Sequence, residues 1–250
     1  MINKRNSKSF FVIGCMSGTS LDGIDLAYVK FTKNNHWKFE ILASKTIAYS
    51  KKRRNKLNKA IHLTPVALKE FDIEYTDFLG NVILKFIKNH KIEKLDFIAS
   101  HGHTIFHQPE KSLTLQIGNL RNLANKIGYP VVCDFRKQDI LLGGQGAPLV
   151  PIGDMLLFSK YTACVNLGGF SNISIFQKGN VLAYDICAVN TVLNFLANKV
   201  DLAFDDKGEM ARSGKEIPSL FKALEKLEFY LQPPPKSLGV EWVQKNILLD

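Results

Sequence analysis

The feature that most constrains the fold of this chain is a layout that occurs twice: strand, small-residue turn, strand, turn, strand, helix. The first copy has β-rich apolar runs at residues 10–15, 24–31 and 37–48. The second copy has them at residues 162–166, 173–177 and 181–185, with a helical pattern at 190–198. Short connections between neighbouring strands favour antiparallel meanders. The repeat is one of architecture and not of residue identity, so the sequence predicts two units that begin alike.

The segment after the first meander alternates helices and strands. Thr64 is a suitable N-cap with Pro65 at the first helical position. Apolar residues then recur at helical spacing as far as Phe86. A strand is expected at 95–100, a helix at 119–127 and a strand at 130–133. This order is typical of the α/β class with a mixed sheet.

Two units are therefore predicted, one over residues 1–160 and one over residues 161–250. The second unit repeats the opening layout in a shorter stretch of chain. We expect it to be C-terminally truncated, without its last sheet strands and covering helices.

Composition excludes several classes of protein. No apolar run approaches the roughly 18 residues of a membrane span, and the run after the basic N-terminus is too short for a signal peptide. The cysteines lie far apart without a CxxC pair, which argues against zinc and favours reduced thiols. They are Cys15, Cys133, Cys164 and Cys187. We expect a cytoplasmic protein that does not contact membranes.

The net charge of +10 fits a nucleic-acid binder, a lysine-rich proteome or an enzyme with anionic substrates. The densest basic cluster, residues 51–54, lacks the interleaved aromatic residues of a single-strand binder. Nucleic acid is therefore not the expected partner, although a basic nucleic-acid binder stays an alternative.

The two small-residue turns carry the first functional signal. Residues 16–25 read MSGTSLDGID, and residues 166–174 read NLGGFSNIS. Successive backbone N–H groups in such a bend form an anion nest, and Ser and Thr hydroxyls add donors for phosphate. A single turn of this kind is more often structural. Two of them at matching places predict one nucleotide held from both sides.

Carboxylates follow both turns. Asp185 ends the third strand of the second unit, where it is either a partly shielded general base or a cap of the next helix. Asp22 and Asp25 flank the first turn, where they either hold magnesium through water or stabilise the bend.

A histidine cluster and a mixed-charge cluster follow two of the predicted strands. His101, His103 and His107 resemble metal ligands. However, Gly102 and the position at a strand end indicate a loop, and the segment has no acidic partner, so substrate hydrogen bonding is favoured. In the stretch DFRKQD, the charged residues form either a structural ion-pair network or a site where the Arg136 guanidinium binds a sugar carboxylate; they are Asp134, Arg136 and Asp139.

Five segments occur in an order that resembles a known family. They are GCMSGTSLDGID, SHGHT, DFRxxD followed by GGQGAPLVP, NLGGFSNIS, and AYD with a later Asn. Together they resemble the anhydro-N-acetylmuramic acid kinases of peptidoglycan recycling in the bacterial cell wall. That family shares the fold of sugar kinases, actin and heat-shock ATPases. The resemblance implies two actin/hexokinase-like (ribonuclease H-like) units with mixed five-stranded sheets, the second incomplete.

The resemblance also implies roles for individual residues. Asp185 would be the catalytic residue that activates water. The ATP-binding residues would be Gly18, Thr19, Ser20, Leu21, Asp22, Gly23, Ile24, Asp25, Gly168, Gly169 and Asn172. The substrate-binding residues would be His101, Thr104, Arg136, Asp139 and Asn190. ATP and Mg²⁺ are the implied cofactors, while the metal ligands stay unknown.

The implied reaction opens the anhydro bridge of the amino sugar with water and phosphorylates its O6 with ATP, giving N-acetylmuramate 6-phosphate. The sequence departs from the family at Met16, where the wider superfamily has Asp, and at His103, where Gln is usual. Asp185 is followed by ICAVN in place of TGPGN. A GGGxxN-type adenosine motif is absent, so this 250-residue form is expected to bind ATP poorly and to have little activity.

Two other functions stay open at this point. One is a non-catalytic nucleotide-binding interaction protein of the same superfamily, and the other is a related sugar kinase that does not hydrolyse its substrate. The expected partners are a small amino sugar and ATP, and a homodimer is left open.

Overall fold

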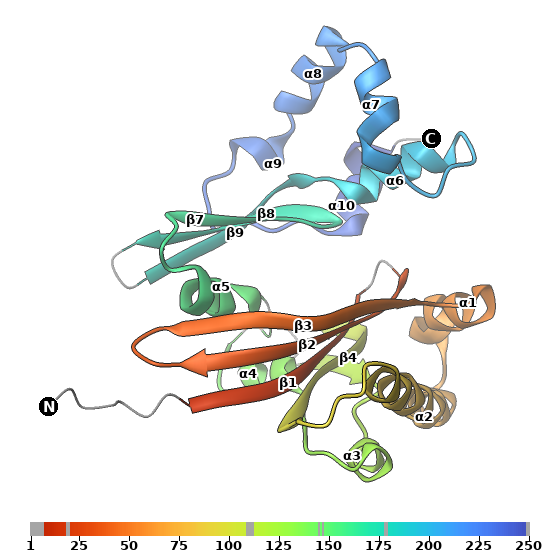
Figure 1. Ribbon diagram of the computed structural model, residues 1–250. Helices are drawn as coiled ribbons and strands as arrows, with labels where there is room; N and C mark the ends of the chain where they lie inside the picture. Colours follow the sequence, from red (N-terminus) through yellow and green to blue (C-terminus); the bar gives the residue numbers. More distant parts are fainter. Residues whose placement is uncertain are drawn as a thin grey trace, which may run out of the picture. The chain divides into compact units, whose positions relative to one another are not determined.

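The computed structural model describes residues 8–18, 21–108, 113–144, 146, 148–177 and 180–248. It divides into two compact units, Met1–Leu149 and Val150–Asp250. Figure 1 shows the two units, which are described separately below. The functional units predicted over residues 1–160 and 161–250 stay a prediction.

The first unit is built on a mixed sheet with the order β3-β2-β1-β4-β5, and β6 pairs with β4 as well. Its strands are β1 (Lys8–Ser17), β2 (Gly23–Lys33), β3 (Trp37–Ala48), β4 (Phe97–Gln108), β5 (Leu113–Ile117) and β6 (Val131–Val132). Strands β1, β2 and β3 form the predicted antiparallel meander, and β4 runs parallel to β1. The predicted α/β class with a mixed sheet is thus confirmed.

Helices of the first unit connect these strands. They are α1 (Lys51–Lys59), the 3₁₀ helix η1 (Ala60–His62), α2 (Pro65–Asn89), α3 (Asn122–Ile127) and α4 (Phe135–Leu141). Helix α2 begins as predicted, because the Thr64 hydroxyl accepts a hydrogen bond from the Ala67 N–H at 3.3 Å and Pro65 follows the cap. None of the helices in the described part of the chain is long and apolar enough to cross a membrane.

The main hydrophobic core joins α2 to the meander and to β4. Its fully buried side chains include Tyr75, Leu79 and Ile83 of α2, Ile13 of β1 and Ile98 of β4. The regular apolar spacing of α2 therefore has the structural consequence expected of it: one helix face covers the sheet.

The sheet has more strands than expected. The prediction had five strands, at residues 10–15, 24–31, 37–48, 95–100 and 130–133. Strand β4 continues to Gln108 and pairs in antiparallel fashion with β5, which was not predicted. The histidine segment therefore lies within a strand and not in a loop. A register shift between Thr104 and Phe106 and a positive φ at Gly102 accommodate the irregular residues.

The second unit contains an antiparallel sheet with the order β7-β8-β9. These strands are Ala163–Leu167, Phe170–Gln177 and Asn180–Ala188. The helices are α5 (Val150–Phe158), α6 (Asn190–Asn198), η3 (Asp206–Gly208), α7 (Glu209–Ser213), α8 (Pro218–Glu225), α9 (Glu228–Leu231) and α10 (Val240–Asn246). Three antiparallel strands followed by helix α6 repeat the opening layout, while the predicted turn at residues 178–179 lies outside the described residues.

Burial differs between the two units. Among the described residues, most buried apolar side chains belong to the first unit, and those of the second are Ala197, Phe229 and Val243. Helices α6 and α8 instead expose apolar side chains such as Leu196 and Phe221. Less buried apolar area means less local stabilisation, so the second unit is held together more weakly.

Candidate active site

The first turn joins β1 to β2 and lies at the edge of the core. The Leu21 N–H donates to the Gly18 carbonyl at 3.3 Å, and the Asp22 carboxylate accepts from the Gly23 N–H at 3.0 Å. A Cβ on Gly23 would lie 2.4 Å from the Ile47 carbonyl oxygen, so this position requires glycine. The Asp22 carboxylate thus stabilises the bend locally, whatever else it binds.

The residues expected at the ATP phosphates differ in how far their side chains are exposed. The Ile24 side chain is fully buried in the core and the Leu21 side chain nearly so, which leaves only their backbone groups for a ligand. The exposed Asp25 carboxylate accepts from the Thr46 hydroxyl at 2.5 Å. Thr19 and Ser20 lie outside the described residues.

A buried hydrogen-bond chain runs beneath the first turn. The Ser17 hydroxyl lies 2.8 Å from Nδ1 of His103 and 2.7 Å from the Tyr49 hydroxyl, which in turn lies 2.5 Å from the Tyr75 hydroxyl. Ser17 and His103 are each 3% exposed. Burial, helped by nearby His101, lowers the pKa of His103 to about 4, so its ring is neutral at pH 7. Sequence reasoning missed this chain because its four members are far apart along the chain.

The histidines of the SHGHT segment point to different partners. His103 binds Ser17, whereas Nε2 of His101 accepts from Nε of Arg136 at 2.8 Å. Nδ1 of His107 lies 3.3 Å from the Thr114 hydroxyl. No group of three metal-ligating side chains converges within the described ranges. The three histidines therefore make separate hydrogen bonds in the structure, and their predicted role in substrate binding stays a prediction.

His101 and Arg136 form a polar cluster with the loop that follows α4. Arg136 also donates from Nη1 to the Gly146 carbonyl at 2.8 Å, and the Asp139 carboxylate accepts from the Gly146 N–H at 2.7 Å. Burial lowers the pKa of Arg136, and burial lowers that of His101 as well, with the Arg136 charge adding to the effect. Three of the predicted substrate residues are thus brought together.

Thr104 is not part of that cluster. Its hydroxyl accepts a weak hydrogen bond from the Gln116 amide at 3.4 Å, across the β4–β5 pair. The predicted role of Thr104 in substrate binding stays a prediction.

Asn119 is a site residue that the sequence did not reveal. Its side chain accepts from the Ser100 hydroxyl at 2.8 Å and donates to the His101 carbonyl at 3.2 Å. Gly102 has φ +70°, and a Cβ there would lie 2.6 Å from the Ile117 carbonyl oxygen. Asn119 and Gly102 together fix the backbone that carries His101. The only local sequence feature that could have indicated Asn119 is the short stretch IGN at residues 117–119, and such a stretch is typical of an ordinary turn.

The second turn consists of Gly168 and Gly169 alone. Strand β8 already begins at Phe170, so Asn172 lies in a strand and not in the turn as expected. The carbonyls of both glycines accept backbone N–H groups at the start of α6, among them that of Asn190 at 3.2 Å. A Cβ on Gly169 would lie 3.0 Å from the Thr191 hydroxyl oxygen. The turn is therefore fitted closely to the first turn of α6.

Asp185 lies inside β9, which continues to Ala188, and not at a strand end as expected. Helix α6 has Val189 at its N-cap, so Asp185 does not cap that helix. Its carboxylate oxygen Oδ2 accepts from the Leu238 N–H at 2.8 Å, and its own N–H donates to the Lys236 carbonyl at 2.9 Å. The structural alternative to a catalytic role, a helix cap, is thereby removed.

Polar side chains form a row on one face of the second sheet. Asn166, Asn172 and Asp185 are register partners across β7, β8 and β9, and directly opposed residues share a face. Ser174 lies two residues from Asn172 on the same strand, so it shares this face, and its hydroxyl donates to the Asp154 carboxylate of α5 at 2.9 Å.

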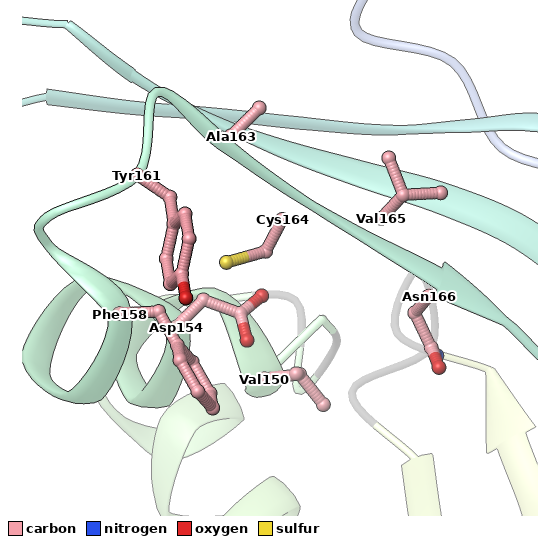
Figure 2. Close-up of a pocket in the computed structure, with 8 residues that line it drawn as sticks. All are labelled: Val150, Asp154, Phe158, Tyr161, Ala163, Cys164, Val165 and Asn166. Atoms are coloured by element: carbon pink, nitrogen blue, oxygen red, sulfur yellow. The ribbon is translucent and has the colours of Figure 1, made fainter.

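A pocket of about 540 Å³ opens between α5 and β7. Figure 2 shows Asp154 on the α5 side and Cys164 on β7 facing into it, with Tyr161 beside them. Asn166 lines its other end. The pocket therefore lies along the face of the second sheet that also carries Asp185.

A mixed sheet that opens with a three-strand meander, followed by a second unit that opens in the same way, defines an α/β protein of the sugar-kinase and actin fold class. The chain belongs to the anhydro-N-acetylmuramic acid kinase family, whose model matches residues 10–250.

Individual relatives carry the same family name. The chain is 34% identical to the anhydro-N-acetylmuramic acid kinase of Sulfurimonas denitrificans, over 96% of this chain and 68% of the relative. It is 34% identical to that of Idiomarina loihiensis, over 94% and 68%. It is 31% identical to that of Bacillus thuringiensis subsp. konkukian, over 92% and 65%. The chain thus spans about two thirds of the length of these relatives.

Proposed function

We propose that this chain is an ATP-dependent kinase that hydrolyses the anhydro ring of 1,6-anhydro-N-acetylmuramic acid and phosphorylates O6, giving N-acetylmuramate 6-phosphate for cell-wall recycling. The family match over residues 10–250 carries this proposal. The held carboxylate of Asp185 supports it, because a base that activates water must be fixed in direction.

In the proposed mechanism Asp185 is the general base. Its Oδ2 is occupied by the Leu238 N–H, which leaves Oδ1 to take a proton from water. The water oxygen forms a bond to the anomeric carbon while the bond from that carbon to the bridging O6 breaks. The electron pair stays on O6, which attacks the γ-phosphorus, and ADP leaves. The carboxylate acts on the face opposite the leaving oxygen, as the base of an inverting glycosidase does.

The first turn is proposed to hold the ATP phosphates through residues 18–25, and the second through Gly168, Gly169 and Asn172. Phosphoryl transfer depends on alignment and charge neutralisation, which Mg²⁺ supplies when it is bound. Either Asp22 or Asp25 is proposed to hold Mg²⁺ through water, since this ion commonly uses one or two carboxylates together with phosphate oxygens and water.

Arg136 is proposed to bind the lactyl carboxylate of the sugar. None of the ion pairs found in the described ranges involves Arg136, although its guanidinium is partly buried. A guanidinium removed from water without a carboxylate partner favours an anionic ligand. His101 and Asp139 would shape this subsite, and Thr104 and Asn190 are proposed as further sugar contacts.

The test uses ¹⁸O-labelled water, the anhydro sugar and Mg-ATP, with protein in excess so that a single slow turnover is detected by mass spectrometry. The expected product carries one ¹⁸O at the anomeric carbon and one phosphate on O6. Asp185→Asn should abolish product but leave Mg-ATP binding unchanged by calorimetry. Asp154→Asn, which alters a carboxylate of α5 that contacts the same sheet face through Ser174, is the matched control. Product without ¹⁸O, or undiminished turnover by Asp185→Asn, would contradict the proposal.

Cellular placement follows from the cofactor, since ATP is a cytoplasmic compound, and we propose a cytoplasmic location. A homodimer is proposed as an assembly to be checked by light scattering. A filter-binding titration without salt-sensitive affinity for DNA or RNA would exclude the nucleic-acid alternative.

A further inference from the structure

A short segment between α9 and α10 runs along the outer edge of β9. It comprises Lys236, Ser237 and Leu238 and is called the strap below. Two hydrogen bonds join it to one residue of β9: the Asp185 N–H donates to the Lys236 carbonyl at 2.9 Å, and the Leu238 N–H donates to Asp185 Oδ2 at 2.8 Å. The strap therefore holds both the backbone and the carboxylate of Asp185 from the side opposite β8.

The strap has its own anchor at Lys236. The Lys236 ammonium donates to the Phe229 carbonyl at 2.9 Å and lies 4.6 Å from the centre of the Phe229 ring. Phe229 is 4% exposed, so this contact is largely shielded from water. A charge-assisted hydrogen bond together with a cation–π contact is stronger than either alone in such a place.

The anchor rests in turn on an aromatic cluster. The rings of Phe229 and Trp242 lie 5.5 Å apart and those of Tyr230 and Trp242 lie 6.3 Å apart. Helix α10 starts at Val240, immediately beyond the strap, and α9 ends before it. Figure 1 shows these two helices on either side of the connecting segment. The strap is thus fixed at both ends by helices that pack on each other.

We propose that Lys236 is a positioning residue that orients the Asp185 carboxylate through the strap. Lys236 does not touch the reacting atoms in this proposal. It fixes the strap, and the Leu238 N–H fixes Oδ2, so that Oδ1 keeps one direction toward the attacking water. This inference rests on the proposed role of Asp185 as the general base.

The reason such a residue is needed lies in the rotation of the carboxylate. An Asp side chain turns about χ2 with a broad, shallow preference, so the backbone of β9 alone does not set the direction of its oxygens. A single backbone N–H donor at a fixed place removes that freedom, and a small misplacement of a catalytic group is costly in rate.

The test begins with Lys236→Met, which removes the ammonium but retains an unbranched stem over the Phe229 ring. Lys236→Arg keeps a cation and a donor, and Lys222→Met, on the exposed surface of α8, is the matched control. Leu238→Pro removes the single N–H that binds Oδ2. Two readouts are made by NMR on the whole chain: amide exchange at Asp185 and Leu238, and the chemical shift of the Asp185 carboxyl carbon.

In Lys236→Met, the amide hydrogens of Asp185 and Leu238 should exchange with solvent about tenfold faster, because their hydrogen bonds are no longer held by the anchor and open more often. The same substitution should also move the carboxyl resonance in the same direction as Leu238→Pro does. Lys236→Arg and Lys222→Met should match the unaltered chain in both readouts. If Lys236→Met leaves the amides and the carboxyl resonance unchanged, or if Lys236→Arg behaves like Lys236→Met, the proposal is wrong.

A kinetic arm separates positioning from simple loss of structure. Lys236→Met should lower kcat for sugar phosphorylation by about tenfold while KM for Mg-ATP stays within about twofold. Equal kcat in the two proteins would overturn the positioning role. Should Asp185→Asn remain active while the NMR changes occur, the proposed function fails but the strap contact stands. Should Asp185→Asn be inactive and the NMR signals not respond to Lys236→Met, the strap proposal alone fails.

Discussion

Replacing His103 with Gln should make the first unit less sensitive to acid. The ring of His103 is 3% exposed and hydrogen-bonded to Ser17, and burial lowers its pKa from 6.5 to about 4. A glutamine offers the same pocket a donor and an acceptor for Ser17 but does not titrate. His103→Gln therefore removes the proton linkage and keeps a hydrogen bond.

The sign of the effect follows from proton binding in the two states. Between pH 4 and pH 6.5 the unfolded chain binds a proton at this histidine and the folded chain does not, so stability rises with pH in that window. The contribution is fully present above pH 6.5 and is lost as the pH falls toward 4. The whole shift corresponds to about 3 kcal/mol, of which about 2 kcal/mol is lost between about pH 7 and about pH 5.

The assay is urea unfolding at pH 7 and at pH 5, followed by tryptophan fluorescence. The chain has two tryptophans, Trp37 in the first unit and Trp242 in the second. Both proteins carry Trp242→Phe, so that Trp37, packed near Phe10 and Phe31, reports on the first unit alone. This choice matters because a chain of two units need not unfold in one step.

The unaltered chain should lose about 2 kcal/mol more than His103→Gln when the pH is lowered. His101 and the carboxylates titrate in both proteins, so their contributions cancel in the difference. An equal loss in the two proteins, within about 0.5 kcal/mol, would refute the reasoning that a buried neutral histidine underlies the effect.

Four further predictions concern stability. Ser17→Ala should destabilise the first unit by about 2–4 kcal/mol in the same urea assay, because it removes two buried hydrogen bonds and leaves the ring nitrogen of His103 unpaired. Tyr75→Phe should lower the free energy of unfolding by only about 0.5–1.5 kcal/mol, since the Tyr49 hydroxyl loses Tyr75 but keeps Ser17 as a partner. A larger loss than that caused by Ser17→Ala would contradict the network. Gly102→Ala should lower the Tm measured by calorimetry, because its φ of +70° and a Cβ contact of 2.6 Å both oppose a side chain. Limited trypsin digestion should cut the weakly packed second unit first, and survival of that unit after loss of the first would disprove the difference in stability.

The sequence predicted the parts of the fold whose signals are local. Helix α2 was predictable because its cap, its Pro65 and its apolar spacing all lie within one stretch of chain. The meander was predictable for the same reason, since short connections join its strands. Strand β5 was missed because Gly102 and the histidines made the preceding segment look like a loop. Pairing with β1 on one side and β5 on the other holds that segment in a strand despite its irregular residues.

The site was predicted less completely because its geometry depends on distant partners. From the sequence, Asp185 could be either a general base or the cap of the next helix. The structure excludes the second role, because Val189 is the N-cap of α6. The Asp185 carboxylate binds the backbone of Leu238, which lies 53 residues further along the chain. The histidines are close in sequence, yet His101 and His103 bind Arg136 and Ser17, which lie on different elements.

The second turn shows how the structure limits which backbone groups are available for the proposed phosphate site. A glycine-rich bend between strands was expected to direct N–H groups toward an anion. The carbonyls of Gly168 and Gly169 are directed at the N-terminal N–H groups of α6. In a trans peptide the N–H points away from the carbonyl of the same unit, so the N–H of Gly169 is directed away from α6. We therefore propose the Gly169 N–H as a donor to phosphate, and not the N-terminus of α6, because the first N–H groups of that helix already bind the two glycine carbonyls.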